Sequence, residues 1–392
     1  MPVYLPPRYI PMSPKVEPER SISPLTLWHG IKIMGLEARI KKLCQNFTDQ
    51  EIDSFLVSQP ENRRYLSGFD GSAGYLLITP QNRILATDFR YLEQAKKQAP
   101  GYEIFKISGE IGDWLPGLVV ELNLRQLGFE AGHTTFSCYH KLSDTLNKAK
   151  LSLRLVPVEG MVESLRAIKE PGEIEFIIKA AAISDAATEY IETIICAGMS
   201  ERELAWEIEK FMRERGSEAM PFDIIVASGP NSALPHARPS SRQIASGEPV
   251  LIDVGARISG YGSDLTRTIC LGASNENFDR VYDVVLGAQL AAIAMIKQGM
   301  SGEDADKIAR IVIEEAGYGE AFGHSLGHGV GLRPHEPPRL GPKSQEKLAD
   351  GMVFTIEPGI YLAGWGGVRI EDTVVMEDGE IRVISKSRKV ET

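Results

Sequence analysis

Two acidic residues on either side of a predicted turn are the first feature that indicates chemistry. Asp253 and Asp264 stand in LIDVGARISGYGSDLTRT, an apolar strand that turns at Ser259-Gly260 and returns. A hairpin centred there places the two carboxylates nearly opposite one another, with Cβ atoms about 5 Å apart. Two like charges beside apolar residues raise each other's pKa, and a metal ion removes that conflict. A polar hairpin with solvated aspartates explains this pair alone equally well.

A second pair of acids repeats the arrangement further along the chain. In FTIEPGIYLAGWGGVRIEDT, Glu357 and Glu371 are symmetric about Gly364, and apolar residues flank both acids. Pro358-Gly359 perturbs the strand, so the predicted register of this hairpin is approximate. Two acid-bearing hairpins in one part of the chain are difficult to explain as solvated surface, so together they favour a cation site.

Three histidines lie between the two hairpins, in the glycine-rich segment AFGHSLGHGVGLRPHEPP. His324 and His328 have the i, i+4 spacing of zinc-binding helices, but the glycines around them make a helix unfavourable. The glycines instead indicate backbone that packs tightly against a site, with imidazoles projecting into it. A single histidine is more often structural, whereas three between His324 and His335 favour a functional role.

The ligand types predict which ions such a site holds. Four carboxylates and one neutral imidazole balance the charge of two divalent cations. Oxygen-rich ligand sets with a single nitrogen suit Mn²⁺, Co²⁺ or Zn²⁺. Two such ions activate a water molecule as a nucleophile, so hydrolysis is the expected chemistry.

The composition limits the classes of protein that fit. The chain has 392 residues, of which 43% are hydrophobic and 24% charged, as in soluble globular proteins. Its net charge of −10 argues against nucleic acid or an anionic membrane as the partner. Its 4 cysteines show no Cys-x-x-Cys pairing, and no apolar run approaches the roughly 18–20 residues of a membrane helix. We therefore expect a cytoplasmic protein that binds neither nucleic acid nor membrane.

The order of predicted elements divides the chain into three parts. Residues 1–35 form a Pro-rich extension in which Met34 opens a helix, and residues 36–162 alternate helix and strand as in a mixed α/β domain. Residues 163–392 form the second domain, with helices over 173–197, 201–215, 277–297 and 302–316 and a Ser200–Glu203 capping box. Its strands are predicted over 223–228, 249–258, 262–271, 352–361 and 367–376. Helices flanking a largely antiparallel sheet make this domain α+β.

These segments together resemble one enzyme family. IVASGPNSALPHARP, LIDVGARISGYGSDLTRT, GHSLGHGVGLRPHE, FTIEPGIY and GVRIEDT are similar to motifs of the pita-bread metallopeptidases, which include Xaa-Pro aminopeptidase, prolidase and methionine aminopeptidase. The likeness covers residues 36–392 and is strongest to bacterial Xaa-Pro aminopeptidase and prolidase, because SQPENRRYLSGFDGSAG resembles their creatinase-type N-terminal domain. It implies a C-terminal pita-bread domain preceded by that smaller domain.

The resemblance also implies a role for each candidate residue. Asp253, Asp264, His328, Glu357 and Glu371 would bind two divalent ions, with Mn²⁺ expected, and Glu357 would act as general base. His236 and His335 would flank the substrate, stabilise the oxyanion and assist proton transfer. His324 and Arg369 match further substrate-pocket positions, although an ion pair of Arg369 with Asp372 or with a metal-binding acid fits as well. Arg333-Pro334 depart from the family pattern next to His335.

The family offers three functions. The first expectation is an aminopeptidase that releases the N-terminal residue from peptides with proline second. The second is a prolidase confined to Xaa-Pro dipeptides, and the third is a pita-bread binding protein without catalysis, which typically lacks metal ligands that are complete here. We expect proline-containing peptides as substrates and a homodimer as the assembly.

Overall fold

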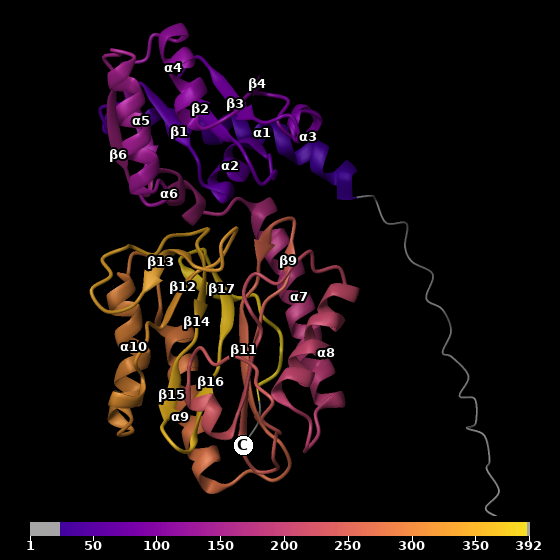
Figure 1. Cartoon of the computed structure of the whole chain (residues 1–392). Helices are drawn as coiled ribbons and strands as arrows, with labels where there is room; N and C mark the ends of the chain where they lie inside the picture. The colour runs from indigo at the N-terminus through magenta and orange to yellow at the C-terminus, as the bar shows by residue number, and fades with distance from the viewer. Residues whose placement is uncertain (1–23, 390–392) are drawn as a thin grey trace, which may run out of the picture.

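Residues 24–389 are described in the computed structural model of the chain, and they form two domains stacked one above the other (Figure 1). The predicted Pro-rich extension lies outside this range up to residue 23. Helix α1 (Pro24–Gln45) begins ten residues before the predicted start at Met34. A proline in the first turn costs a helix little, because the N–H it lacks has no partner there.

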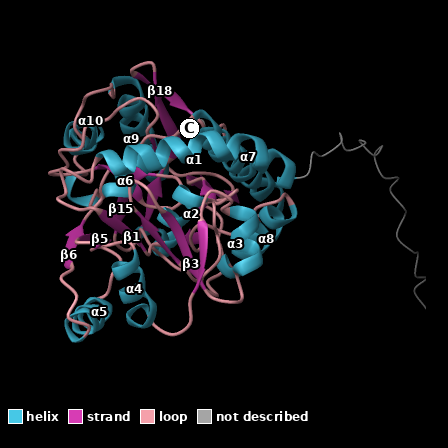
Figure 2. Cartoon of the chain, turned by 90° about the horizontal axis from the view of Figure 1, so that it is seen from above, coloured by secondary structure: helices cyan, strands magenta, loops and turns pink. Residues whose placement is uncertain are grey.

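The N-terminal domain is a six-stranded mixed sheet with helices on both faces. The strands are ordered β4-β3-β2-β1-β5-β6. Alternate residues of each strand face opposite sides, so Leu76 and Ile78 pack towards α1 and α2 while Leu77 packs towards α4 and α5. Seen from above, α1 lies beside α2 and α6 (Figure 2). The elements are β1 (Ser54–Val57), α2 (Pro60–Ser67), β2 (Tyr75–Ile78), β3 (Arg83–Thr87), α3 (Leu92–Gln98), β4 (Glu103–Lys106), α4 (Ile111–Glu121), β5 (Gln126–Glu130), α5 (Phe136–Lys148), β6 (Arg154–Val158) and α6 (Met161–Ala167).

The C-terminal domain places antiparallel strands between two pairs of helices, as predicted for an α+β domain. Its main sheets are β11-β8-β7 and β13-β12-β14-β17-β18. Helices α7 and α8 pack on one side, and α9 and α10 pack on the other (Figure 1). The elements are α7 (Pro171–Ile194), α8 (Glu201–Glu214), β7 (Ile225–Ser228), η1 (Gly229–Ala233), β8 (Pro249–Val254), β9 (Arg257–Ile258), β10 (Tyr261–Gly262), β11 (Leu265–Cys270), α9 (Glu276–Met295), α10 (Gly302–Glu315), η2 (Gly319–Ala321), β12 (Gly327–Gly329), β13 (Glu336–Leu340), β14 (Val353–Ile356), β15 (Gly359–Leu362), β16 (Gly366–Arg369), β17 (Asp372–Glu377) and β18 (Glu380–Val383).

Local signals in the sequence account for several of these elements. The predicted capping box at the start of α8 is present, with Ser200 and Glu203 each bonding the other's backbone N–H. The short strands β12, β13 and β18 were not predicted. In β12, a Cβ on Gly327 or Gly329 would collide with the backbone of Thr355 or Pro337, so these glycines allow close packing of neighbouring strands.

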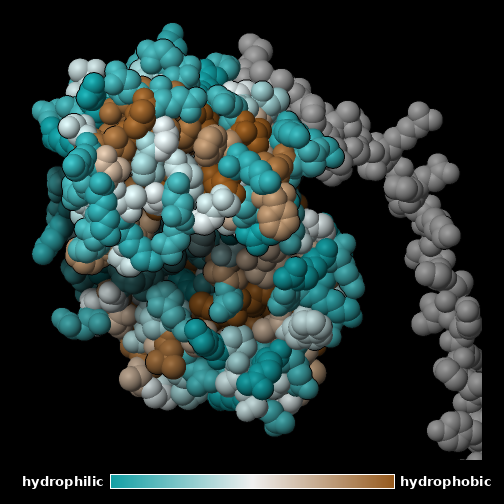
Figure 3. Space-filling view, turned by 45° about the horizontal axis from the view of Figure 1, so that its top comes forward, coloured by the Kyte–Doolittle hydropathy of each residue, from teal (hydrophilic) through white to brown (hydrophobic). Residues whose placement is uncertain are grey.

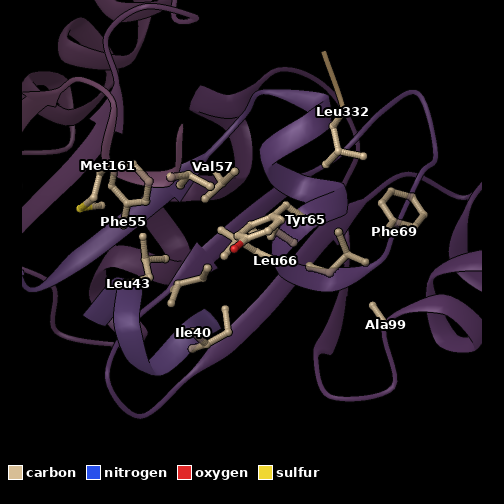
Figure 4. Packing of buried hydrophobic residues seen from close by; sticks show 14 of the residues in the cluster. Ile40, Leu43, Phe55, Val57, Tyr65, Leu66, Phe69, Ala99, Met161 and Leu332 are labelled. Atoms are coloured by element: carbon tan, nitrogen blue, oxygen red, sulfur yellow. The ribbon is translucent and has the colours of Figure 1, made fainter. Parts of the chain in front are cut away.

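One hydrophobic cluster continues from the N-terminal domain into the C-terminal domain. Leu332, in the loop before β13, is 4% exposed and belongs to the cluster of Tyr65, Leu66 and Phe69 (Figure 4). The predicted domain boundary at residue 162 falls inside α6, and we propose residues 168–170 as the junction. Within residues 24–389, no helix combines the length and apolar character needed to cross a membrane.

Candidate metal centre

The first pair of acids lies at the sheet formed by β8 and β11, with Asp253 in β8 and Asp264 directly before β11. Asp253 pairs with Thr266, and the turn lies at Ser259-Gly260 as predicted. On this register, Asp264 stands across from Gly255 and diagonal to Asp253. The expectation of nearly opposite carboxylates is therefore corrected, because the true centre of the hairpin lies one residue later than their midpoint. Both carboxylates still point to the same face of the sheet.

The second pair of acids faces one another directly. The ladders on either side of Pro358, β14 with β17 and β15 with β16, keep one register centred on Gly364. On that register Glu357 is opposite Glu371, so the predicted symmetry is confirmed. The proline interrupts the pairing without shifting it. The Glu371 backbone N–H donates to the Thr266 carbonyl at 3.1 Å, which joins this hairpin to β11 and the first pair.

His328 lies between the two pairs. It stands on β12, next to β14, and its Nε2 is 3.2 Å from Glu357 Oε1 and 3.8 Å from Asp264 Oδ2. One ligand atom each of Asp264, His328 and Glu371 lies within 4.8 Å of the other two. The structure thus brings Asp264, His328 and Glu371 together with Glu357 beside them, and Asp253 interacts electrostatically with Glu357 and His328.

The carboxylates of this cluster repel one another. Burial, and then the neighbouring carboxylates, raise the pKa of Asp264 and of Glu371 well above the usual range. Burial favours the neutral form of Glu357 as well, but the hydrogen bond and charge of His328 outweigh it and lower the pKa of Glu357 to about 2. Without cations the cluster therefore retains protons, which a divalent ion would displace.

Arg369 lies behind Asp253. Its Nη2 donates to Asp253 Oδ2 at 2.6 Å, and the residue is 3% exposed. Other guanidinium donors go to the Thr266 hydroxyl, the Pro235 carbonyl and the Tyr361 hydroxyl. This geometry favours the alternative in which Arg369 pairs with an acid of the site over contact with substrate, although that acid is Asp253 and not Asp372.

His324 is a partner of the same arginine through Tyr361. Its Nε2 lies 2.9 Å from the Tyr361 hydroxyl, and its Nδ1 lies 2.8 Å from the Ser325 carbonyl oxygen. Both ring nitrogens are thus occupied by the protein. The substrate contact of His324 stays a prediction, and its contact with Tyr361 adds a role in fixing that side chain.

Three polar residues around the acids were not predicted from the sequence. Thr266 donates to Glu371 Oε2 at 2.6 Å, and Thr355 donates to Glu357 Oε1 at 3.0 Å. Tyr361 is the third. The signal was available, because each stands two or four residues from Asp264 or Glu357 and so shares a strand face with it.

A buried ion pair supports Glu371 from behind. Arg267 Nη2 lies 2.7 Å from Asp372 Oδ1, and Arg267 Nη1 donates to the Glu371 carbonyl at 2.5 Å. Lys389 Nζ approaches the other oxygen of Asp372 at 2.8 Å. The end of the described chain is thus attached directly behind the metal centre.

Two further histidines lie on the open side of the cluster. The His335 ring meets that of His328 edge-on, with centroids 4.0 Å apart. Partial burial, and then the charge of His328, lower the pKa of His335 to about 4. His236 is exposed in the loop after η1, close enough to contribute to the lowered pKa values of His324 and His335. The molecular face in Figure 3 is hollowed between the two domains.

The cluster fits divalent cations on observations of its own. Asp253 Oδ1 is buried and finds no hydrogen-bond partner among the described residues. The donor set is oxygen-rich with one imidazole, and the raised pKa values of Asp264 and Glu371 are ones that a bound cation would lower. An unpaired buried carboxylate oxygen is costly unless a ligand satisfies it.

Comparison with known proteins gives the family. The model of metallopeptidase family M24 matches residues 175–378. The chain belongs to metallopeptidase family M24. Residues 39–168 of this M24 member match the creatinase/prolidase N-terminal domain. The predicted pita-bread architecture with a creatinase-type N-terminal domain is confirmed.

Relatives of known structure resemble this M24 member over nearly their whole length. It is 44% identical to the Xaa-Pro dipeptidase from Bacillus anthracis, with a TM-score of 0.87 and coverage of 91% of this chain and 99% of that chain. It is 36% identical to the X-Pro aminopeptidase from Thermotoga maritima, with a TM-score of 0.80 and coverage of 88% of this chain and 99% of that chain. The Xaa-Pro dipeptidase of Pyrococcus horikoshii is 38% identical over 356 residues, which are 90% of this chain and 98% of the relative. As an M24 metallopeptidase, the chain is a hydrolase that uses divalent metal ions.

Proposed function

We propose that this M24 peptidase hydrolyses the bond before proline and that Xaa-Pro dipeptides are its substrates. The match to the Bacillus anthracis Xaa-Pro dipeptidase, over 99% of that chain at 44% identity, carries the proposal. Xaa-Pro aminopeptidase, the first expectation from the sequence, becomes the second candidate. It is favoured by the 36% identity to the Thermotoga maritima enzyme.

The five clustered residues would hold the metal ions. Asp253, Asp264, His328, Glu357 and Glu371 supply four carboxylates and one imidazole, which balance two divalent cations, with Mn²⁺ expected. When bound, such ions polarise the scissile carbonyl and lower the pKa of water. Arg369 orients Asp253, and the Thr266 and Thr355 hydroxyls orient Glu371 and Glu357.

Glu357 is the proposed general base. Its side chain is 15% exposed at the metal cluster, so the carboxylate is placed to accept a proton from a water molecule bound there. Its Oε1 lies 3.2 Å from His328 Nε2, and an attacking water molecule would be deprotonated at this position. The proton must then reach the proline nitrogen, which leaves as an amine.

His335 is the proposed stabiliser of the oxyanion. With its pKa lowered to about 4, the imidazole is neutral at pH 7 and keeps one N–H to donate to the developing negative charge. His236 would face the substrate from the loop after η1. An Xaa-Pro bond has no N–H and a fixed φ, so a pocket shaped for the ring selects proline without hydrogen-bonding the nitrogen.

A panel of peptides tests the proposal. Metal-free enzyme reloaded with Mn²⁺ is given Ala-Pro, Ala-Pro-Ala and Ala-Ala, with Glu357→Gln as the matched inactive control. Hydrolysis of Ala-Pro alone supports the dipeptidase. Cleavage of Ala-Pro-Ala at a comparable kcat/KM moves the assignment to aminopeptidase, and equal cleavage of Ala-Ala contradicts proline specificity. The homodimer and the cytoplasmic location stay predictions.

A further inference from the structure

The loop that carries His335 is anchored in the N-terminal domain. Leu332, three residues before His335, is 4% exposed and packs in the core cluster that is built mainly from N-terminal residues (Figure 4). Strands β12 and β13 lie at the end of the C-terminal domain that faces the N-terminal domain (Figure 1). The position of this loop therefore depends on contacts across the domain interface.

A buried ionic cluster holds the other side of His335. The next residue, Glu336, has a side chain that is 3% exposed, between Arg166 and Lys169, whose side chains are 2% and 1% exposed. Arg166 Nη2 donates to Glu336 Oε2, and Lys169 Nζ lies 2.9 Å from Glu336 Oε1. Burial alone would raise the pKa of Glu336, but the two cations outweigh it and keep the carboxyl ionised.

The cluster extends into the N-terminal sheet. Arg166, in the last turn of α6, also donates through Nη1 to Asn62 Oδ1 at 2.7 Å. Asn62 in turn donates to Glu130 Oε1 at 2.7 Å, and Glu130 ends β5. Arg166 thus connects the N-terminal sheet to the residue that follows His335.

Glu336 is also placed to fix the geometry of the metal centre. It pairs with Gly329 across β12 and β13, next to His328, at the point where the register shifts. A Cβ on Gly331 would collide with the Glu336 carboxylate, so the carboxylate fills the space that this glycine leaves. Movement of Glu336 would therefore move His335 and its edge-on contact with His328.

From these contacts we infer that Arg166 is a positioning residue of the N-terminal domain that holds His335 in its catalytic place through Glu336. The inference rests on the role of His335 under the proposed function. It gives the N-terminal domain a part in the reaction although it supplies no residue of the metal cluster. Catalytic groups displaced by about 1 Å lose up to about a hundredfold in rate.

The test compares two cross-domain ion pairs. Arg166→Met removes the contact to Glu336. Arg39→Met is the matched control, because Arg39 joins α1 to Glu170 at 2.8 Å and to Glu173 of α7 at 3.4 Å without touching β13. We expect Arg166→Met to lower kcat on Ala-Pro roughly tenfold to a hundredfold at unchanged Mn²⁺ stoichiometry, and Arg39→Met to keep kcat within about twofold. Arg166→Lys keeps the positive charge but cannot donate to both Asn62 and Glu336 as the guanidinium does. It should therefore restore kcat only in part.

A double mutant separates positioning from general stability. If Arg166 acts through His335, Arg166→Met combined with His335→Ala is no slower than His335→Ala alone. The inference would be overturned if the losses in kcat of Arg166→Met and His335→Ala multiply in the double mutant. It would also be overturned if Arg166→Met keeps the wild-type kcat, or if Arg39→Met loses as much kcat as Arg166→Met. If His335→Ala itself keeps wild-type kcat, the proposed function loses that role, whatever Arg166 does. Should Arg166→Met not fold, Lys169→Met removes the partner of the other Glu336 oxygen and carries the same expectation.

Discussion

Arg369 and Asp253 form a buried ion pair in which only one carboxylate oxygen is satisfied. Oδ2 accepts from the guanidinium at 2.6 Å, while Oδ1 has no hydrogen-bond partner within residues 24–389. The protein thus fixes the carboxylate by one oxygen and leaves the other available to a cation. A preformed site of this kind trades some stability of the metal-free protein for ligand binding.

Replacing Arg369 should destabilise the metal-free protein more than the metal-loaded protein. Arg369→Met leaves Asp253 buried without its cation, which costs about 3–5 kcal/mol when one partner of a buried pair is removed. Bound metal would neutralise the same carboxylate, so the loss should be smaller in the loaded protein. Urea unfolding in EDTA and in excess Mn²⁺ measures both values. An equal loss in the two states would mean that Asp253 does not contact the metal.

His335 should matter to the reaction and not to metal retention. His335→Ala removes the N–H that we assign to the oxyanion, and loss of such a donor costs about a hundredfold or more in kcat. Metal content after gel filtration should equal that of the wild type. Should metal be lost along with activity, His335 is a ligand and the division of roles between His328 and His335 is wrong.

Stabilisation by metal should increase with pH. In the metal-free fold the pKa of Asp264 and of Glu371 lies well above the usual range, so the folded state retains protons that the unfolded state releases from about pH 4 upward. That contribution to stability is present at low pH and lost as the pH rises through the raised values. The loaded protein holds both groups ionised at all these pH values.

The difference in Tm between Mn²⁺-loaded and EDTA-treated protein reports this effect. It should widen as the pH is raised from about 5 to about 8, because the metal-free form loses stability there. Groups away from the cluster contribute equally to both forms, whereas Asp253 and His328, whose pKa values are also raised, add to the same trend. A gap that stays constant or narrows over this range would contradict the assignment of Asp264 and Glu371 as metal ligands.

The sequence predicted the acids of the site better than their supports. The symmetry of Glu357 and Glu371 about Gly364 could be read from the hairpin, since strand pairing depends on the turn centre. For Asp253 and Asp264 the turn at Ser259-Gly260 was predicted correctly, but its centre lies one residue after the midpoint of the two aspartates, so their carboxylates are diagonal and not opposite. An ion pair of Arg369 with a metal-binding acid was among the expectations, but the individual partners Asp253, Pro235 and Tyr361 were not predictable, because they come from separate parts of the chain. Glu336 and Arg166 are 170 residues apart in the sequence, so no local sequence pattern predicts their contact.

The stoichiometry of metal binding tests the central claim most directly. Titration of metal-free wild-type protein with Mn²⁺, followed by calorimetry and Ala-Pro hydrolysis, should show two equivalents bound and activity restored. Asp264→Asn removes a carboxylate that interacts with Asp253 of its own pair and with Glu357 and Glu371 of the other. This variant should fold with near-wild-type circular dichroism, bind fewer than two equivalents of Mn²⁺ and show no turnover. A wild-type protein that binds no Mn²⁺ or Co²⁺ and remains inactive, or an Asp264→Asn variant that turns over normally, would contradict the account.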